Sequence, residues 1–304
     1  MRVLLTGAAG FIGKQIARSL QNSWAVYAVV RDSNTLSAKQ LAGYSTLIED
    51  DISQGLTRER YPTKIDAVIH CAQSLAYQTF PANALDVSNV NVAATAHLLD
   101  YGLKAGATSF CHISSGSVYE PYDQTLHEGS VLTPSSINGC SKAAAEMLVR
   151  SYASLMKTCS LRVFMPYGPG QTNRLLPNLI HKVLMGETIT LAQGRGPVIA
   201  PIHVEDVANI ISSACQDQWQ GVVNIAGMET MPLSDVVTSI AKTLRQDLNI
   251  KTTSEASINL TPPLDILKSK IPTVGFIDFK TGLSETISAY LSEGTNDINP
   301  FRST

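Results

Sequence analysis

The sequence predicts an α/β fold in which a doubly wound parallel sheet is followed by a smaller C-terminal lobe. Short apolar runs alternate with segments of helical periodicity through the first 165 residues, as in repeated strand–helix units. The first apolar run leads directly into a glycine-rich turn. Beyond the sixth run, Pro166–Gly170 interrupts regular structure and is expected to lead the chain into the smaller lobe.

A strand, a glycine-rich turn and a helix open the chain at Arg2–Gly13. Val3–Leu5 is an apolar run typical of a strand that is covered on both faces. Gly7, Gly10 and Gly13 follow at G-x-x-G-x-x-G spacing, which suits a sharp turn, a close approach to a pyrophosphate and helix–strand packing, in that order. The first N–H groups of the helix would face the anion. The stretch therefore predicts dinucleotide binding.

The end of the second expected strand, Ala25–Val30, indicates which dinucleotide is bound. An acidic residue at this place commonly accepts hydrogen bonds from the ribose hydroxyls, whereas a basic residue suits a 2′-phosphate. Arg31 can pair with a phosphate, while Asp32 could still reach a ribose. The pair favours NADP, with NAD as the alternative.

Later strand ends supply side chains to the same edge of the sheet, where ligands bind in open α/β folds. The third strand ends in Leu47–Ile52, whose acidic tip is expected near the adenine end of the cofactor, and the fourth, Asp66–Ala72, leads into a loop. Further segments are expected at 89–105 (helix), Ser109–Ser114 (strand), Leu161–Phe164 (strand), 175–185 (helix), Ile202–Val207 (return to the sheet), 233–244 (helix) and 281–291 (helix).

Composition and charge argue against several classes of protein. The chain of 304 residues is 44% hydrophobic and 16% charged, with a net charge of -2 and an isoelectric point near 6.3, which disfavours nucleic-acid and membrane partners. The start of the sequence shows no basic leader, and no apolar run reaches transmembrane length. Five cysteines without C-x-x-C pairs favour reduced thiols over disulfides or a metal site. We therefore expect a cytoplasmic protein without a metal.

Motifs spread over most of the chain carry a resemblance to a known family. They are Thr6–Gly13 (TGAAGFIG), Asp66–Ala72 (DAVIHCA), Asn91–Thr95 (NVAAT), His112–Tyr119 (HISSGSVY), Ser141–Lys142 (SK), Arg162, Tyr167–Gln171 (YGPGQ), His203–Val207 (HVEDV) and Val223–Ile225 (VNI). With them the chain resembles an extended short-chain dehydrogenase/reductase, specifically the NAD-dependent epimerase/dehydratase family, whose members act largely on nucleotide sugars. The resemblance implies a Rossmann-type dinucleotide-binding domain at 1–165 plus about 200–228, and a substrate-binding lobe at 166–199 and 229–304.

The resemblance also implies the catalytic residues, one of which is replaced. Ser115 matches the family's serine that hydrogen-bonds the reacting oxygen, and Lys142 matches the lysine that holds the nicotinamide ribose. The family's proton-transferring tyrosine stands four residues before that lysine, and this position is Asn138. A carboxamide does not titrate near neutral pH and cannot serve as the acid or base. Ser115, Asn138 and Lys142 are assigned to the catalytic site.

Three explanations of Asn138 stay open. The proton-transfer role has moved to another group, the protein binds its cofactor without turnover, or the residue is an active-site substitution that traps a complex. For a moved role, the candidates around the site are Cys71, Cys140, Tyr119, Glu120 and His112. The expected function is that of an NAD(P)-dependent epimerase, dehydratase or ketoreductase acting on a nucleotide sugar.

Two positions of the expected substrate lobe depart from the family pattern. Family members that bind nucleoside diphosphate sugars usually carry an Asn just after the sixth strand and an Arg shortly before the His-Val-x-Asp motif. Here these positions are Met165 and Ile199, and the nearest basic substitutes are Arg174, Lys182 and Arg195. A nucleotide sugar is the leading substrate class. An NADP-dependent reductase of a non-nucleotide carbonyl compound is the alternative.

The resemblance further implies the cofactor contacts and the assembly. The expected cofactor-binding residues are Gly7, Gly10, Phe11, Ile12, Gly13, Arg31, Asp51, Ile52, Cys71, Ala72, Asn91 and Lys142. Several family members pair through a four-helix bundle. The helices near 89–105 and 139–154 are therefore expected to form the interface of a homodimer.

Overall fold

The computed structural model describes residues 1–271 and 275–294. The chain divides into two compact units. Unit 1 comprises Met1–Phe164, Glu205–Ile225 and Pro263–Ile271. Unit 2 comprises Met165–Val204, Ala226–Pro262 and the described part of Pro272–Thr304. The segment Pro263–Ile271 returns to unit 1, which the boundaries expected from the sequence did not include.

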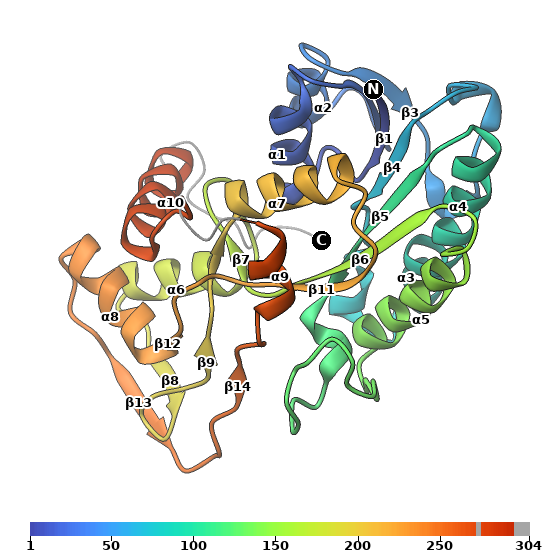
Figure 1. The fold of residues 1–304 in the computed structure, drawn as a ribbon. Helices are drawn as coiled ribbons and strands as arrows, with labels where there is room; N and C mark the ends of the chain where they lie inside the picture. The colour runs from blue at the N-terminus through green and yellow to red at the C-terminus, as the bar shows by residue number, and fades with distance from the viewer. Residues whose placement is uncertain (272–274, 295–304) are drawn as a thin grey trace. The chain divides into compact units, whose positions relative to one another are not determined.

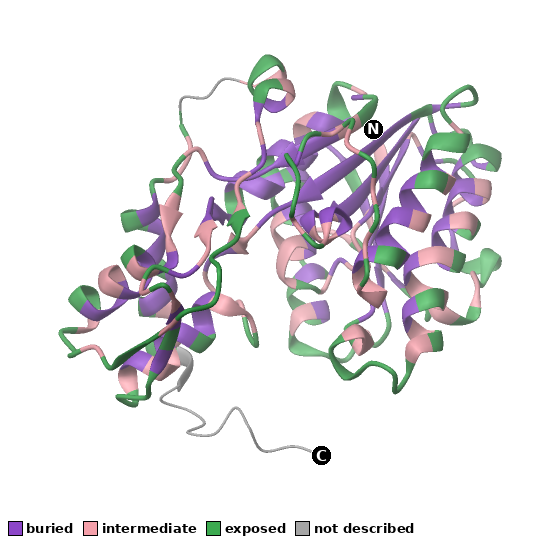
Figure 2. Ribbon diagram, turned by 90° about the horizontal axis from the view of Figure 1, so that it is seen from below, coloured by how far each residue is buried: buried purple, intermediate pink, exposed green. Residues whose placement is uncertain are grey.

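Unit 1 is built on a seven-stranded sheet (Figure 1). Its strands are β1 (Arg2–Thr6), β2 (Ala25–Val30), β3 (Thr46–Glu49), β4 (Ala67–His70), β5 (Ser109–Ser115), β6 (Lys157–Val163) and β11 (Gly221–Ile225). They lie in the order β11-β6-β5-β4-β1-β2-β3, and every neighbouring pair is parallel. The predicted doubly wound parallel sheet is confirmed. Figure 2 shows that most residues of these strands are buried, which explains why the strands are apolar runs in the sequence.

Helices cover both faces of this sheet (Figure 1). They are α1 (Phe11–Leu20), α2 (Leu36–Leu41), α3 (Ala84–Ser88), α4 (Ala94–Lys104), α5 (Ile137–Ser151), α7 (Val204–Gln216) and α9 (Asp265–Lys270). A π-helical turn, η4 (Asn89–Ala93), joins α3 to α4, so the predicted helix at 89–105 is continuous but not uniformly α-helical. A hydrophobic cluster that includes Leu4, Val68, Leu98 and Phe110 fills the space between the sheet and α4.

The expected return of Ile202–Val207 to the main sheet is wrong. Only Ile202–His203 forms a strand, β10, and it pairs with β7 (Pro166–Tyr167) in a separate two-stranded sheet. Helix α7 begins at Val204, and Glu205 and Asp206 occupy its first turn, where negative charge is favourable. The chain re-enters the seven-stranded sheet one element later, at β11.

Unit 2 has its own hydrophobic core and smaller sheets. Its remaining elements are α6 (Leu175–Leu184), β8 (Ile189–Ala192), β9 (Val198–Ile199), β12 (Met231–Pro232), α8 (Leu233–Leu244), β13 (Ile250–Thr253), β14 (Asn259–Leu260) and α10 (Phe279–Gly294). Leu179, Ile180, Val236 and Ile240 bring α6 and α8 together in that core. The helices predicted at 175–185 and 233–244 are confirmed.

None of the helices in the described ranges combines the length and hydropathy needed to cross a lipid bilayer.

Candidate active site

The strand order of unit 1 reverses between β1 and β4, and the glycine-rich turn lies at this point. Ligands bind at such a switch point in open α/β sheets. Gly7 has a φ of +66°, and a Cβ added there would lie 2.6 Å from the backbone nitrogen of Ala72, which follows β4. A Cβ on Gly13 would lie 2.1 Å from the carbonyl oxygen of Gly7. Both positions therefore require glycine.

The N-terminus of α1 is open to an anion. Gly10 is the N-cap, and no side chain caps the helix. The Gly10 N–H donates to the Gly7 carbonyl at 3.0 Å, which closes the turn. The amides of Phe11, Ile12 and Gly13 precede the first N–H that bonds within the helix, that of Lys14 to the carbonyl of Gly10. This turn fits the pyrophosphate of a dinucleotide, because it offers backbone donors, a helix dipole and space.

The residues expected near the adenosine end lie on loops after β2 and β3. Arg31 and Asp32 are both exposed, and one carboxylate oxygen of Asp32 accepts the Asn34 N–H at 2.8 Å. Asp51 caps a short 3-10 helix by accepting the Ser53 N–H at 3.1 Å, and Ile52 is buried.

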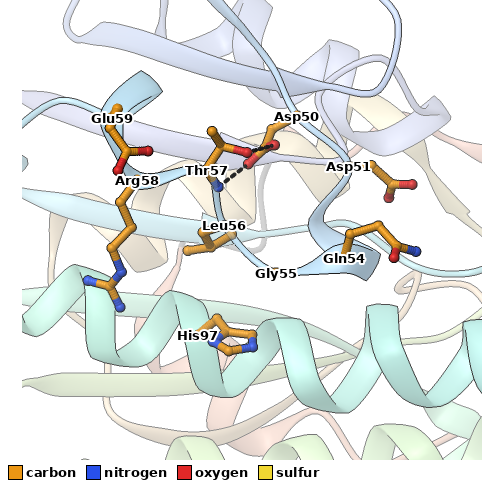
Figure 3. A pocket seen from close by; sticks show the side chains of 9 residues that line it. All are labelled: Asp50, Asp51, Gln54, Gly55, Leu56, Thr57, Arg58, Glu59 and His97. Carbon is orange, nitrogen blue, oxygen red and sulfur yellow. Dashed lines mark hydrogen bonds between the residues drawn. The ribbon is translucent and has the colours of Figure 1, made fainter.

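A surface hollow of about 630 Å³ lies beside this loop (Figure 3). It is lined by Asp50, Asp51, Gln54, Gly55, Leu56, Thr57, Arg58, Glu59 and His97. Asp50 is not available to a ligand, because its carboxylate accepts from the Thr57 N–H at 2.9 Å, the Thr57 hydroxyl at 2.7 Å and the Tyr61 hydroxyl at 2.9 Å. Of the expected cofactor residues, Asp51 alone lines this hollow.

Ser115 and Asn138 lie close together because the turn that follows β5 packs against the start of α5. Ser115 ends β5 and caps the turn η5 (Gly116–Tyr119), where its Oγ accepts the Ser117 N–H at 3.2 Å. Asn138 lies in the first turn of α5, and its Nδ2 donates to Ser117 Oγ at 2.9 Å. The Ser117 hydroxyl in turn donates to Ser115 Oγ at 3.0 Å. Gln73 Nε2 donates to Asn138 Oδ1 at 3.4 Å.

Lys142 lies one turn further along α5 and is 2% exposed. Its Nζ donates to the carbonyl of Ile113 at 2.7 Å. Burial lowers the pKa of Lys142 to about 8, while Cys71 and Glu146 oppose that shift. Burial raises the pKa of the Cys71 thiol to about 11, and the charge of Lys142 opposes it. Cys71 is therefore a neutral thiol at neutral pH.

The other groups considered for proton transfer are engaged or inert. The Tyr119 hydroxyl accepts from Arg162 at 2.7 Å and donates to Asn224 Oδ1 at 2.9 Å, and burial raises its pKa. Glu120 accepts the Ser136 N–H at 3.0 Å.

His112 and Cys140 complete that set. Burial holds the pKa of His112 well below its usual value, so the ring stays neutral, and its Nδ1 is buried without a hydrogen-bond partner. Cys140 is exposed, and its thiol donates to the carbonyl of Pro134 at 3.1 Å. Burial therefore disfavours the charged forms of Cys71, Tyr119 and His112, whereas Glu120 and Cys140 are each engaged in one hydrogen bond.

Asn91 connects two segments of the site by hydrogen bonds. It is 1% exposed, its Oδ1 accepts the Ser74 N–H at 3.0 Å, and its Nδ2 donates to Ser141 Oγ at 2.9 Å. The Ser141 hydroxyl donates to the backbone carbonyl of Asn138 at 3.0 Å. Asn91 thus connects the loop that carries Gln73 to the turn that carries Asn138. A direct contact of Asn91 with a cofactor stays a prediction.

Sequence reasoning missed Gln73 and Ser117. Gln73 directly follows the expected contact Ala72, and Ser117 stands two residues after Ser115, which are the only signals that pointed to them. Among the described residues, no group of three His, Cys, Asp or Glu side chains is arranged to hold a metal ion.

The two residues of unit 2 that depart from the family pattern, Ile199 and Met165, have different surroundings. Ile199 is completely buried in the core of unit 2, where it cannot contact a ligand in this structure. Met165 is partly exposed and has a φ of +43°, a conformation that favours Gly and Asn over Met.

The fold and this turn define the class of protein, an α/β protein with a glycine-rich strand–turn–helix at the switch point of its sheet. The chain belongs to the NAD dependent epimerase/dehydratase family, whose model matches residues 3–226.

Known proteins agree with this assignment. The low-salt glycan biosynthesis protein Agl12 of Haloferax volcanii is 31% identical over 217 residues, which cover 68% of this chain and 70% of that protein. The trifunctional UDP-glucose 4,6-dehydratase/UDP-4-keto-6-deoxy-D-glucose 3,5-epimerase/UDP-4-keto-L-rhamnose-reductase RHM1 of Arabidopsis thaliana is 27% identical over 82% of this chain, which spans 40% of that protein. The structure of MoeE5 in complex with UDP-glucose and NAD is 26% identical, with a TM-score of 0.80 over 97% of this chain and 100% of that one.

Proposed function

We propose that this chain is an NAD(P)-dependent epimerase, dehydratase or ketoreductase that acts on a nucleotide sugar. The observation that carries the proposal is the turn Gly7–Gly13, whose close backbone contacts require glycine and whose following helix has no side-chain cap at its N-terminus. A bound nicotinamide would supply the hydride chemistry. Nucleotide sugars are supported by MoeE5, which was solved with UDP-glucose and NAD.

The residues of the catalytic site take separate roles in this proposal. Ser115 is partly exposed and donates a hydrogen bond to the reacting oxygen. Lys142 holds the nicotinamide ribose, and its charge favours negative charge developing nearby. Asn138 transfers no proton but positions Ser117, and through it Ser115.

Arg31 supports NADP as the preferred cofactor. Its side chain is exposed directly after β2, where a 2′-phosphate would lie, and one oxygen of its neighbour Asp32 is engaged by Asn34. The complex of MoeE5 with NAD supports the alternative.

A second candidate function is cofactor binding without turnover. Asn138 favours it, because the position of the family's acid–base residue holds a group that does not titrate, and Tyr119 and Glu120 are engaged in other hydrogen bonds.

The test is to measure binding of NAD and NADP by calorimetry, and then hydride transfer in both directions, as reduction of the oxidised dinucleotide by UDP-glucose and oxidation of the reduced dinucleotide by UDP-4-keto-6-deoxyglucose. We expect Asn138→Tyr to raise the rate of hydride transfer at least about tenfold, since general acid–base catalysis contributes about 10² to 10⁴. Asn138→Phe is the matched control, because it adds the same ring without the hydroxyl.

Three outcomes separate the candidates. A rate that rises with tyrosine and not with phenylalanine supports the enzyme. Binding of the dinucleotide with no hydride transfer in either direction by the wild type or by Asn138→Tyr, over a panel of UDP- and dTDP-sugars, supports the second candidate. Failure of both dinucleotides to bind contradicts the whole proposal.

We also propose a homodimer formed through the outer faces of α4 and α5. Leu103 on α4 is 38% exposed and Met147 on α5 is 59% exposed, as expected for apolar side chains that a partner covers. Light scattering of the purified protein tests this, and Met147→Glu is expected to give monomers.

A further inference from the structure

We propose that Gln73, Asn138, Ser117 and Ser115 form a one-directional hydrogen-bond chain that makes the site selective for the keto form of its sugar over the alcohol. The inference rests on the proposed function and narrows its substrate to a nucleotide sugar with a carbonyl at the reacting carbon.

The hydrogen-bond chain joins four side chains that come from three separate segments of the sequence. Gln73 Nε2 donates to Asn138 Oδ1 at 3.4 Å, and Asn138 Nδ2 donates to Ser117 Oγ at 2.9 Å. Ser117 Oγ donates to Ser115 Oγ at 3.0 Å. All four residues are partly exposed, so a ligand can reach the end of the chain.

The direction of the hydrogen-bond chain follows from the orientation of the two carboxamides in the structure. The amide nitrogens of Gln73 and Asn138 donate and do not accept. Ser117 Oγ therefore accepts from Asn138, which leaves its proton for Ser115. Ser115 Oγ also accepts the backbone N–H of Ser117 at 3.2 Å.

The Ser115 hydroxyl can therefore make one further hydrogen bond, in which it donates its own proton. A hydroxyl oxygen has two acceptor positions, and on Ser115 both are used. The oxygen that meets Ser115 must therefore be an acceptor. A carbonyl oxygen satisfies this completely, whereas an alcohol also brings a proton that Ser115 cannot accept, and Asn138 is no base to remove it.

The chain is held in place before any ligand arrives. Gly139 follows Asn138, and a Cβ there would lie 2.5 Å from the Ser117 carbonyl oxygen, so the start of α5 packs directly on η5. Ser136 caps α5 by accepting the Gly139 N–H at 3.0 Å. Asn91 fixes the turn of Asn138 to the loop of Gln73 through Ser141 and Ser74. Preorganised donors of this kind stabilise negative charge on an oxygen.

The experiment compares two ligands that differ only in oxidation at one carbon. UDP-4-keto-6-deoxyglucose and UDP-6-deoxyglucose are titrated by calorimetry into the protein saturated with the dinucleotide that it binds more tightly. We expect the keto sugar to bind at least about fivefold more tightly, because a buried polar group left unsatisfied costs about 1 to 3 kcal/mol, which corresponds to roughly 5- to 150-fold.

Substitutions in the chain test its direction. Asn138→Asp replaces the donor by an acceptor, so Ser117 turns its proton away from Ser115, and the keto preference should fall to about twofold or less. Gln73→Ala should weaken the preference by a smaller factor. Gln78→Ala, an exposed glutamine five residues further on, is the control and should leave it unchanged. Dinucleotide affinity equal to that of the wild type shows that each variant is folded.

Three results overturn the inference. Equal affinity of the wild type for both sugars, or a keto preference that survives Asn138→Asp, contradicts the hydrogen-bond chain while leaving nucleotide-sugar binding intact. If the dinucleotide binds and neither sugar does, the substrate class of the proposed function is wrong, and the inference falls with it.

Discussion

The cofactor turn and the catalytic corner lie at the same edge of the sheet in unit 1, but they are specified by different forces. The turn Gly7–Gly13 is fixed by backbone sterics, since added methyl groups would approach backbone atoms to 2.6 Å at Gly7 and 2.1 Å at Gly13. The corner around Ser115 and Asn138 is fixed by side-chain hydrogen bonds between partly exposed groups.

This difference determines how many kinds of residue each region can accommodate. Where two backbones lie this close together, glycine is the one residue that fits, because it has no Cβ. A polar corner has several solutions, because one hydrogen-bonding side chain replaces another when a partner is available. Asn138 has partners on both sides, in Gln73 and Ser117, and so the corner is structured without a titratable side chain at this position.

The largest effect is expected in the cofactor turn. Gly13→Ala places a Cβ 2.1 Å from the Gly7 carbonyl oxygen, which forces the strand and helix apart. We expect the free energy of unfolding to fall by about 4 kcal/mol, with loss of dinucleotide binding. Urea denaturation and calorimetry measure the two. Gly43→Ala is the control, because the nearest atom to its Cβ, the Gln40 carbonyl oxygen, is 3.5 Å away. A Gly13→Ala protein as stable as the control contradicts the steric argument.

A slightly smaller effect is expected from the titration of Lys142, which makes the stability of the folded protein depend on pH in one direction. Its pKa is about 8 in the folded protein, against 10.5 for an unperturbed lysine, so between these values the unfolded chain binds more protons. Stability therefore rises with pH over this window, by roughly 3 kcal/mol in total. Cys71, His70, His112 and Glu146 face the amine.

The measurement is urea denaturation of the wild type and Lys142→Met across this window. The difference in stability between them should move in favour of the wild type as the pH rises, while changes common to both proteins cancel. A constant difference would show that the Lys142 amine is solvated and not shifted.

The third effect returns to the cofactor. If Arg31 pairs with a 2′-phosphate, Arg31→Ala raises the Kd for NADP about tenfold and leaves that for NAD unchanged, because a charge-assisted hydrogen bond contributes about 1.5 to 3 kcal/mol. Arg18→Ala, an exposed arginine on α1, is the control. Equal changes for both dinucleotides would assign Arg31 to a general electrostatic role.

The smallest effect is expected in the catalytic corner. Ser117→Ala should lower the free energy of unfolding by less than about 1 kcal/mol, because its hydrogen bonds are partly exposed. Tyr119→Phe, two residues on, removes buried bonds to Arg162 and Asn224 and should cost about 2 kcal/mol. Thermal denaturation of both variants compares them. Equal costs would mean that the corner is as tightly specified as the core.

Local patterns were sufficient to predict most of the fold. The strand at Ala25–Val30 and the helix at 233–244 have the predicted bounds, because apolar runs and helical periodicity are read over adjacent residues. Ile202–Val207 failed because its apolar start resembles a strand, whereas the acidic residues that follow stabilise the first turn of α7.

The candidate site was less accessible from the sequence. Ser115 and Lys142 stand at recognisable spacings within single motifs. Gln73 is 65 positions from Asn138, and their hydrogen bond depends on the pairing of β4 with β5 and on the packing of α5. No local pattern distinguishes such a glutamine from an ordinary loop residue.

The contact between Gly139 and the Ser117 carbonyl has a consequence for any substitution at position 138. It holds the start of α5 against η5, so any side chain at position 138 meets Gln73 and Ser117 as neighbours. A tyrosine introduced at this position would lose both hydrogen bonds of the carboxamide at once. Any gain in reactivity would therefore come with a cost in stability, which further substitutions at positions 73 and 117 would have to offset.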